Sequence, residues 1–171
     1  MGRDKALLEI EGIPMARRVA EVMRLAGCIP VFAVGPARLA AGLDVVSDDH
    51  PGEGPLGGIL TALRAAAPGP VLVMACDLPW IDAHTVETVL AAAAAEPSEP
   101  PPRAHVFMAC AAQREPLCAV WTPAAANELQ LVFDAGERAV HRAAAGLVVR
   151  EVQVRASGLI NVNAPHDLPS E

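Results

Sequence analysis

Apolar residues recur along the chain at two spacings, one typical of helices and one of strands. From Pro14 to Gly27 they follow the helical spacing, which predicts a helix whose buried face carries Met15, Val19, Val22, Met23 and Ala26. Residues 30–34 and 70–76 form continuous apolar runs, as is typical of strands buried on both faces. The second run predicts the most deeply buried strand of the sheet.

The rest of the chain continues the alternation of strands and helices. Shorter apolar runs predict strands at 6–11, 44–47, 104–110, 117–121, 146–154 and 158–162. Helices are predicted after residue 54, with Leu56, Ile59, Leu60 and Leu63 inward, over 82–95 with Asp82 as N-cap, and from Thr122 and Pro123 as cap and first residue. The polar, proline-rich residues 96–103 are predicted to form a surface connection. Repeated strand–helix units predict one α/β domain over 1–171, with a mostly parallel sheet and helices on both faces.

Composition and charge narrow the class of protein. The formal net charge is -7 and the pI is about 5.2, which argues against nucleic-acid and acidic-membrane binding because both favour basic surfaces. No apolar run has the length of a membrane span, and the N-terminus lacks the pattern of a signal peptide. The four cysteines form no CxxC pair, and Cys76, Cys110 and Cys118 lie in apolar runs where buried free thiols are common. We therefore expect a cytoplasmic protein.

Polar residues that suit a binding site follow three of the predicted strands. Asp48 and Asp49 follow the strand at 44–47, Asp77 follows 70–76, and Asn161 and Asn163 surround the end of 158–162. Ligands of such sheets bind at the carboxyl edge of the strands. Each residue also has an ordinary explanation: Asp77 suits a turn as well as a metal site, the aspartate pair suits a solvated loop, and the asparagines suit local backbone hydrogen bonds.

Two further patterns would indicate a different function. Gly52, Gly54 and Gly57 spell G-x-G-x-x-G, the outline of an NAD(P)-binding fingerprint. Residues 48–51 separate these glycines from the strand, two of those residues are carboxylates that repel a pyrophosphate, and Pro55 removes a backbone donor, so the fingerprint is weak. Nucleophilic catalysis is not supported either, because none of the residues that would serve it has the spacing of a triad or a zincin helix: Glu115, His84, His105 and His141.

Five segments carry a more specific pattern. They are MGRDKALLEIEGIP from residue 1, VVSDDHPGEGPLGGI from 45, VLVMACDLPWI from 71, REPLCAVW from 114 and LINVNAPHDL from 159. In order and spacing, from residue 1 to about residue 168, they resemble the molybdenum cofactor guanylyltransferase family. Related sugar-phosphate and cytidylyl transferases share several of these segments, and GPLGG and REPLCA favour the guanylyl branch.

The resemblance implies a Rossmann-like, three-layer α/β/α nucleotidyltransferase that depends on Mg²⁺. Such an enzyme joins the GMP of GTP to the phosphate of molybdopterin and releases pyrophosphate. GTP and molybdopterin are thus the expected partners, together with proteins that handle molybdopterin and with the molybdoenzymes served. The resemblance assigns catalysis to Lys5 and Asp77, the metal to Asp77, the acceptor to Asn161 and Asn163, and the nucleotide to Lys5, Asp48, Gly54, Pro55, Leu56, Gly57 and Asp77.

Lys5 has a physical reason to be a lysine. It is the single lysine among 13 lysine and arginine residues. Its ammonium is a compact point charge, which suits a triphosphate differently from the planar fork of arginine. Alone, a lysine is most often an ordinary surface charge.

The sequence departs from the family at its beginning. The family's nucleotide loop reads about L-A-G-G-x-S-x-R-M-G-x-D-K, and this chain supplies only the end of it, at residues 1–5. The first, central strand of the sheet is then expected to be missing, and GTP binding by the 171-residue chain to be weak. The alternatives are a cytidylyl or other NTP transferase of the same superfamily, and a truncated, non-catalytic homologue that binds nucleotide or pterin.

Overall fold

A computed structural model of the chain describes residues 5–37, 41–95 and 104–162. Its α-helices are α1 (Met15–Leu25), α2 (Pro55–Ala66), α3 (Ala83–Ala94), α4 (Ala124–Asp134) and α5 (Val140–Ala143). Its strands are β1 (Glu9–Ile10), β2 (Ile13–Pro14), β3 (Phe32–Val34), β4 (Asp44–Val46), β5 (Val71–Met74), β6 (Val106–Cys110), β7 (Arg114–Trp121) and β8 (Val149–Gln153). Short 3₁₀ helices lie at Lys5–Leu7, Ala144–Gly146 and Ala156–Leu159.

The main sheet has four strands in the order β5-β7-β6-β8. β7 runs antiparallel to both of its neighbours, and β6 and β8 are parallel. It follows that β5, β6 and β8 point the same way and β7 alone is reversed. β3 and β4 form a separate parallel pair. The prediction of an α/β fold with parallel strands is confirmed, with one reversed strand that the sequence did not reveal.

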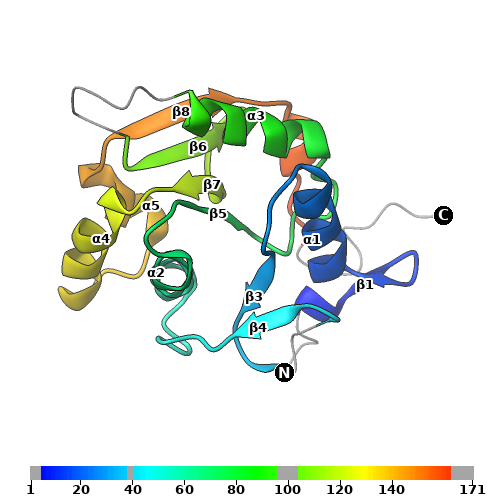
Figure 1. Cartoon of the computed structure of the whole chain (residues 1–171), viewed down its shortest axis with the longest axis horizontal. Helices are drawn as coiled ribbons and strands as arrows, with labels where there is room; N and C mark the ends of the chain where they lie inside the picture. The colour runs from blue at the N-terminus through cyan, green and yellow to red at the C-terminus, as the bar shows by residue number, and fades with distance from the viewer. Residues whose placement is uncertain (1–4, 38–40, 96–103, 163–171) are drawn as a thin grey trace.

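Helices cover both faces of the main sheet. Side chains alternate between the faces along each strand, so neighbouring residues join different cores. Val106, Met108 and Trp121 point to a core shared with α2, α4 and α5. Phe107 and Val120, one position away, point to a core shared with α1 and α3. Figure 1 shows α3 on one side of β6 and β8, and α2 and α4 on the other. The fold is therefore a three-layer α/β/α arrangement, as the resemblance implied.

The sheet is divided between β3 and β5. Figure 1 shows the β3–β4 pair set apart from the four-stranded sheet, and within the described residues no strand joins the two. All four residues of β5 are only half-buried, whereas all five of β6 are buried. The run at 70–76 was predicted to be the most deeply buried strand, and this prediction is wrong because β5 lies at the edge of its sheet.

The N-terminal run 6–11 does not form the single strand that was predicted. Lys5–Leu7 is a 3₁₀ helix, and only β1 is extended, paired with β2 in a two-residue hairpin. The central residues of its turn, Glu11 and Gly12, have φ values of 54° and 75°. Positive φ at both positions is what a type I′ turn requires, and it reverses the chain before a longer strand can form.

The C-terminal run 158–162 is also not a strand. Ala156–Leu159 is a 3₁₀ helix, and the apolar character of the segment is explained by Val162, which is buried against Ile10 and Met15. Val162 N–H donates to the carbonyl of Asp77 over 2.9 Å. This bond fixes the segment to the end of β5 without adding a strand to the sheet.

Helix ends agree with the sequence at two of three places. Gly27, with φ of 89°, ends α1 as predicted, and Asp82 caps α3 by accepting the N–H of Thr85 at 2.7 Å. The third prediction is wrong in detail: α4 begins at Ala124, and the Thr122 hydroxyl donates to carbonyls of Ala104 and His105 instead of capping the helix. The hydroxyl thereby connects the start of α4 to the residues that precede β6.

Thiols and helix lengths complete the description. Cys110 and Cys118 are buried free thiols as predicted, whereas Cys76 is only half-buried, since β5 is an edge strand. Burial, aided by the charge of Glu115, raises the pKa of Cys118 to about 12. No helix in the described part of the chain is long and apolar enough to cross a membrane. The connection 96–103 lies outside the described residues.

Candidate active site

Asp77 lies directly beyond β5, at the carboxyl edge of the main sheet. The β5–β7 pairing continues to Ala75, whose N–H donates to the Leu117 carbonyl at 2.7 Å. Leu78, on the other side of Asp77, is fully buried and anchors the segment in the core. The Asp77 carbonyl accepts the N–H of Val162. Asn161, which precedes Val162 in the sequence and is exposed, is thereby brought close to Asp77. The structure thus brings the predicted metal residue and one predicted acceptor residue to the same place.

A second carboxylate, Glu115, lies beside Asp77. It stands on β7, two residues before Leu117, whose carbonyl accepts the Ala75 N–H, and it lies close enough for the charge of Asp77 to act on it. Burial raises the pKa of Glu115, the hydrogen bond from Leu117 N–H lowers it, and the nearby charge of Asp77 raises it. Two carboxylates that repel each other at a sheet edge are suited to hold a cation.

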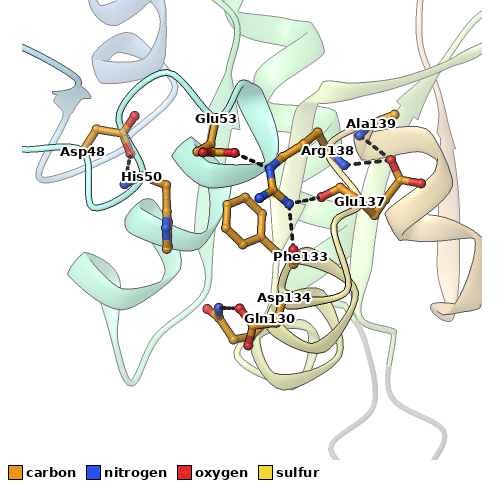
Figure 2. A network of polar contacts seen from close by, with 9 residues as sticks. All are labelled: Asp48, His50, Glu53, Gln130, Phe133, Asp134, Glu137, Arg138 and Ala139. Atoms are coloured by element: carbon orange, nitrogen blue, oxygen red, sulfur yellow. Dashed lines mark hydrogen bonds and ion pairs between the residues drawn. The ribbon is translucent and has the colours of Figure 1, made fainter.

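Asp48 shapes the loop between β4 and α2. Its Oδ1 accepts the N–H of His50 at 3.0 Å (Figure 2) and the hydroxyl of Thr61 at 3.1 Å. Thr61 lies fully buried on α2 and also accepts the N–H of Asp49 at 3.1 Å. Asp49 itself is exposed and forms an ion pair with Arg64. Asp48 therefore holds the loop that leads into the glycine-rich segment, and Asp49 faces solvent.

The glycine-rich segment is the N-terminal turn of α2. Gly54 is its N-cap with φ of 80°, a conformation that favours glycine, and Pro55 follows as the first helical residue, exposed to solvent. Leu56 is fully buried in the core, so only its main chain can face a ligand. Gly57 is buried because His50 packs directly over it. Of the four predicted nucleotide-binding residues here, Gly54 and Pro55 are the accessible ones.

The two remaining predicted residues are less fully defined. The backbone of Lys5 begins a 3₁₀ helix that contacts α1, and its side chain lies outside what the structure describes. Asn163 also lies outside the described residues. Their roles stay predictions.

Comparison with known proteins decides the family. Residues 1–149 match the family model described as the MobA-like NTP transferase domain. The chain belongs to the MobA-like NTP transferase family. The molybdenum cofactor guanylyltransferase of Rhodobacter capsulatus is 31% identical over 98% of this chain and 86% of its own length. The protein of the same name from Pseudomonas aeruginosa is 32% identical, over 96% and 83%.

Solved structures of other proteins share the fold. Molybdopterin-guanine dinucleotide biosynthesis protein A from Archaeoglobus fulgidus matches with a TM-score of 0.76 and 22% identity, over 97% of this chain and 87% of that one. The 2-C-methyl-D-erythritol 4-phosphate cytidylyltransferase from Thermus thermophilus matches with a TM-score of 0.67 and 20% identity, over 95% and 89%. The architecture of this MobA-like chain is therefore that of a nucleotidyltransferase.

The sequence did not reveal every residue of this MobA-like site. Glu115 was considered only as a member of a triad, and its place beside Asp77 depends on the β5–β7 pairing, which local patterns do not fix. The signal available was that two apolar strands, 70–76 and 117–121, each adjoin an acid. His50 and Glu53 lie in the segment from residue 45 that carries the resemblance but were given no role, and Arg138, which meets them beside α2 in Figure 2, gave no signal at all.

The site offers two carboxylates as oxygen ligands and lacks, within the described residues, a full set of protein ligands for a metal ion. In the described residues no three His, Cys, Asp or Glu side chains gather as a metal group. Magnesium suits such an edge, because it keeps several waters and binds through one or two carboxylates plus substrate phosphates. Asp77 and Glu115 supply that number of carboxylates, so the residues present fit a magnesium ion.

Proposed function

We propose that this MobA-like NTP transferase moves GMP from GTP to the phosphate of molybdopterin and releases pyrophosphate, which forms the guanine dinucleotide form of the molybdenum cofactor. The names of its relatives from Rhodobacter capsulatus and Pseudomonas aeruginosa support this choice. The observation that carries it is the 2.9 Å hydrogen bond from Val162 N–H to the Asp77 carbonyl. It brings the acid proposed for the metal and the asparagine proposed for the acceptor to one edge of the sheet.

The reaction requires little covalent chemistry from the protein. An oxygen of the molybdopterin phosphate attacks the α-phosphorus of GTP, the bond from that phosphorus to the bridging oxygen breaks, and the pyrophosphate leaves with the electron pair. The protein positions the two substrates in line and offsets the negative charge. Magnesium, when bound, supplies positive charge to the phosphate oxygens. Asp77 and Glu115 would hold it.

The remaining residues bind and orient the substrates. Lys5 supplies a second positive charge to the triphosphate. The loop that Asp48 holds, with Gly54 and Pro55 at its end, lets the backbone approach the ribose or base. Asn161 and Asn163 present amides to the pterin and phosphate side of the acceptor. None of these roles requires a covalent intermediate on the enzyme.

A different base is the main alternative. A cytidylyltransferase from Thermus thermophilus shares the fold with a TM-score of 0.67, so CTP is a realistic competitor of GTP at such a site. A non-catalytic homologue that binds nucleotide or pterin is the other alternative, since the sheet is divided beside β5.

A substrate panel tests the proposal. The purified chain is incubated with Mg²⁺, molybdopterin and GTP, CTP or ATP at millimolar concentration, and pyrophosphate release and product mass are measured. The millimolar concentration allows for the weak GTP binding that the sequence predicts, and under it we expect release only with GTP and only when molybdopterin is present. Turnover of CTP alone would replace the guanylyl assignment, and absence of turnover with every nucleotide would support the non-catalytic homologue.

A further inference from the structure

The glycine-rich loop is fastened at two points to the end of α4. We call the four residues involved, His50, Glu53, Phe133 and Arg138, the loop clamp (Figure 2). His50 and Glu53 belong to the loop before α2, whereas Phe133 and Arg138 belong to α4 and the turn after it. Glu53 and Arg138 are 85 residues apart in sequence. The clamp is thus a tertiary device and not a feature of the loop alone.

Arg138 is the centre of the loop clamp. Its Nε donates to Glu53 Oε2, and its Nη1 donates to the carbonyls of Phe133 at 2.6 Å and Glu137 at 2.8 Å. The guanidinium carbon also lies 3.8 Å from the centroid of the Phe133 ring. The Phe133 carbonyl lies in the last turn of α4 and the Glu137 carbonyl in the turn that follows, so together they hold the fork in one orientation and aim its Nε at the loop.

The second fastening is aromatic. The rings of His50 and Phe133 are 4.6 Å apart at their centroids and inclined by 52°. In Figure 2 the Phe133 ring lies between His50 and Arg138. Phe133 is buried in the core that α4 shares with α2, so its ring is held by the packing of both helices. His50 N–H is meanwhile held by Asp48, so the start of the loop is fixed from both sides.

The loop clamp contributes little to global stability. The side chains of Arg138 and Glu53 are 39% and 48% exposed, and ion pairs of that exposure are typically worth less than a single core contact. Their effect is instead local, because a loop held in one conformation loses less entropy when it binds a ligand. Arg138 is suited to that purpose, because three of its contacts are to Phe133 and Glu137 and the fourth is to Glu53 of the loop.

We infer that Arg138 is a positioning residue, which holds the loop 50–54 through Glu53 and Phe133 in the conformation that receives the nucleotide. This inference rests on the proposed function, because it takes the adjoining Gly54 and Pro55 to be a nucleotide site. Arg138 acts through other residues and is not itself required to touch the substrate.

Two variants and one control test the inference in the full chain. Arg138→Ala removes the contacts to both Glu53 and Phe133, and Glu53→Gln removes only the exposed ion pair and leaves the packing of Phe133. Arg142→Ala is the matched control, because Arg142 is an exposed arginine of the same region whose partner is Glu137 and not the loop. Amide hydrogen exchange is measured at residues 50–54 without nucleotide, and Kd for Mg-GTP is measured by titration.

We expect both clamp variants to speed exchange at residues 50–54 and to raise Kd about two- to fivefold, the range expected when one partly exposed ion pair is lost. The double variant should lose no more than Arg138→Ala alone, because Glu53 acts on the loop only through Arg138. Arg142→Ala should change neither quantity. Unchanged exchange in Glu53→Gln and Arg138→Ala would overturn the inference, as would faster exchange with an unchanged Kd. Failure of the unaltered chain to bind GTP would contradict the proposed function, while the exchange data would still decide whether the clamp holds the loop.

Discussion

Gly57 lies so close to His50 that a Cβ built on the glycine would be 2.7 Å from the Cβ of the histidine and 3.3 Å from its carbonyl oxygen. Neither atom is the end of a flexible side chain, so any larger residue must displace the loop. Gly58, the next residue of α2, has open space where its Cβ would be. The two adjacent glycines therefore have different physical reasons to be present.

This difference gives a matched pair of variants. Gly57→Ala should destabilise the chain by about 1–3 kcal/mol, the usual cost of overpacking, and should weaken Mg-GTP binding because His50 moves. Gly58→Ala should stabilise α2 by about 0.5–1 kcal/mol, since alanine loses less backbone entropy than glycine. Denaturant unfolding and nucleotide titration measure both effects. Equal behaviour of the two variants would show that His50 does not pack over Gly57 in solution.

Lys5 provides a test of charge geometry. If its ammonium offsets charge on the triphosphate, Lys5→Arg should lower kcat almost as much as Lys5→Ala, by about 100-fold, because the planar guanidinium misplaces the charge. The readout is the initial rate of pyrophosphate release at saturating nucleotide. Arg17→Lys, at an exposed i,i+4 pair with Glu21, is the control for a generic basic exchange. Wild-type activity in Lys5→Arg would return Lys5 to an ordinary surface charge.

Asn161 should act on the acceptor more than on the nucleotide. It is exposed next to the buried Val162, whose N–H fixes the segment to Asp77. Asn161→Ala should raise the KM for molybdopterin about five- to tenfold, as expected for one lost hydrogen bond of about 1 kcal/mol, and leave Kd for GTP unchanged. Ile160→Ala, at the exposed neighbouring position, is the control. Equal losses for both substrates would indicate a structural role.

The position of β5 at the edge of the sheet predicts which of its amides exchange fast with solvent. Ala75 N–H donates to β7, and alternation along the strand directs Val73 N–H to β7 as well, so the amides of Leu72 and Met74 point to the open side. We expect Leu72 and Met74 to exchange much faster than Val73 and Ala75 in hydrogen-exchange measurements resolved by residue. Equal protection of all four amides would show that another strand covers this edge in solution.

The sequence predicted the elements whose signals are local. The α1 face and the Asp82 cap depend on residues within a few positions of each other, and both were found as expected. The runs 6–11 and 158–162 were misread because apolar residues that pack as isolated anchors, such as Ile10 and Val162, resemble those of a strand. The place of β5 at the edge depends on the partners available to it, and no pattern within 70–76 reports those.

The residues of the candidate site also differ in whether a local sequence pattern could indicate them. Asp77 and Asp48 were predicted because they follow apolar strands, and the resemblance named them as well; their roles stay predictions. Glu115 and Arg138 were missed because strand pairing brings one to Asp77, and helix packing brings the other to a loop 85 residues away. Leu56 illustrates the reverse case, since its side chain faces the core and only its main chain belongs to the predicted loop.

The most direct test of the account is the transfer of labelled GMP to molybdopterin by Asp77→Asn, compared with Asp82→Asn. The control removes a charge five residues away but retains the cap of α3, because asparagine accepts the Thr85 N–H as well as aspartate does. The account predicts Mg²⁺-dependent transfer by the unaltered chain, transfer within about twofold of it by Asp82→Asn, and a loss of about 100-fold or more by Asp77→Asn with an unchanged Tm. Near-normal transfer by Asp77→Asn would contradict the account, as would an unaltered chain that transfers no GMP.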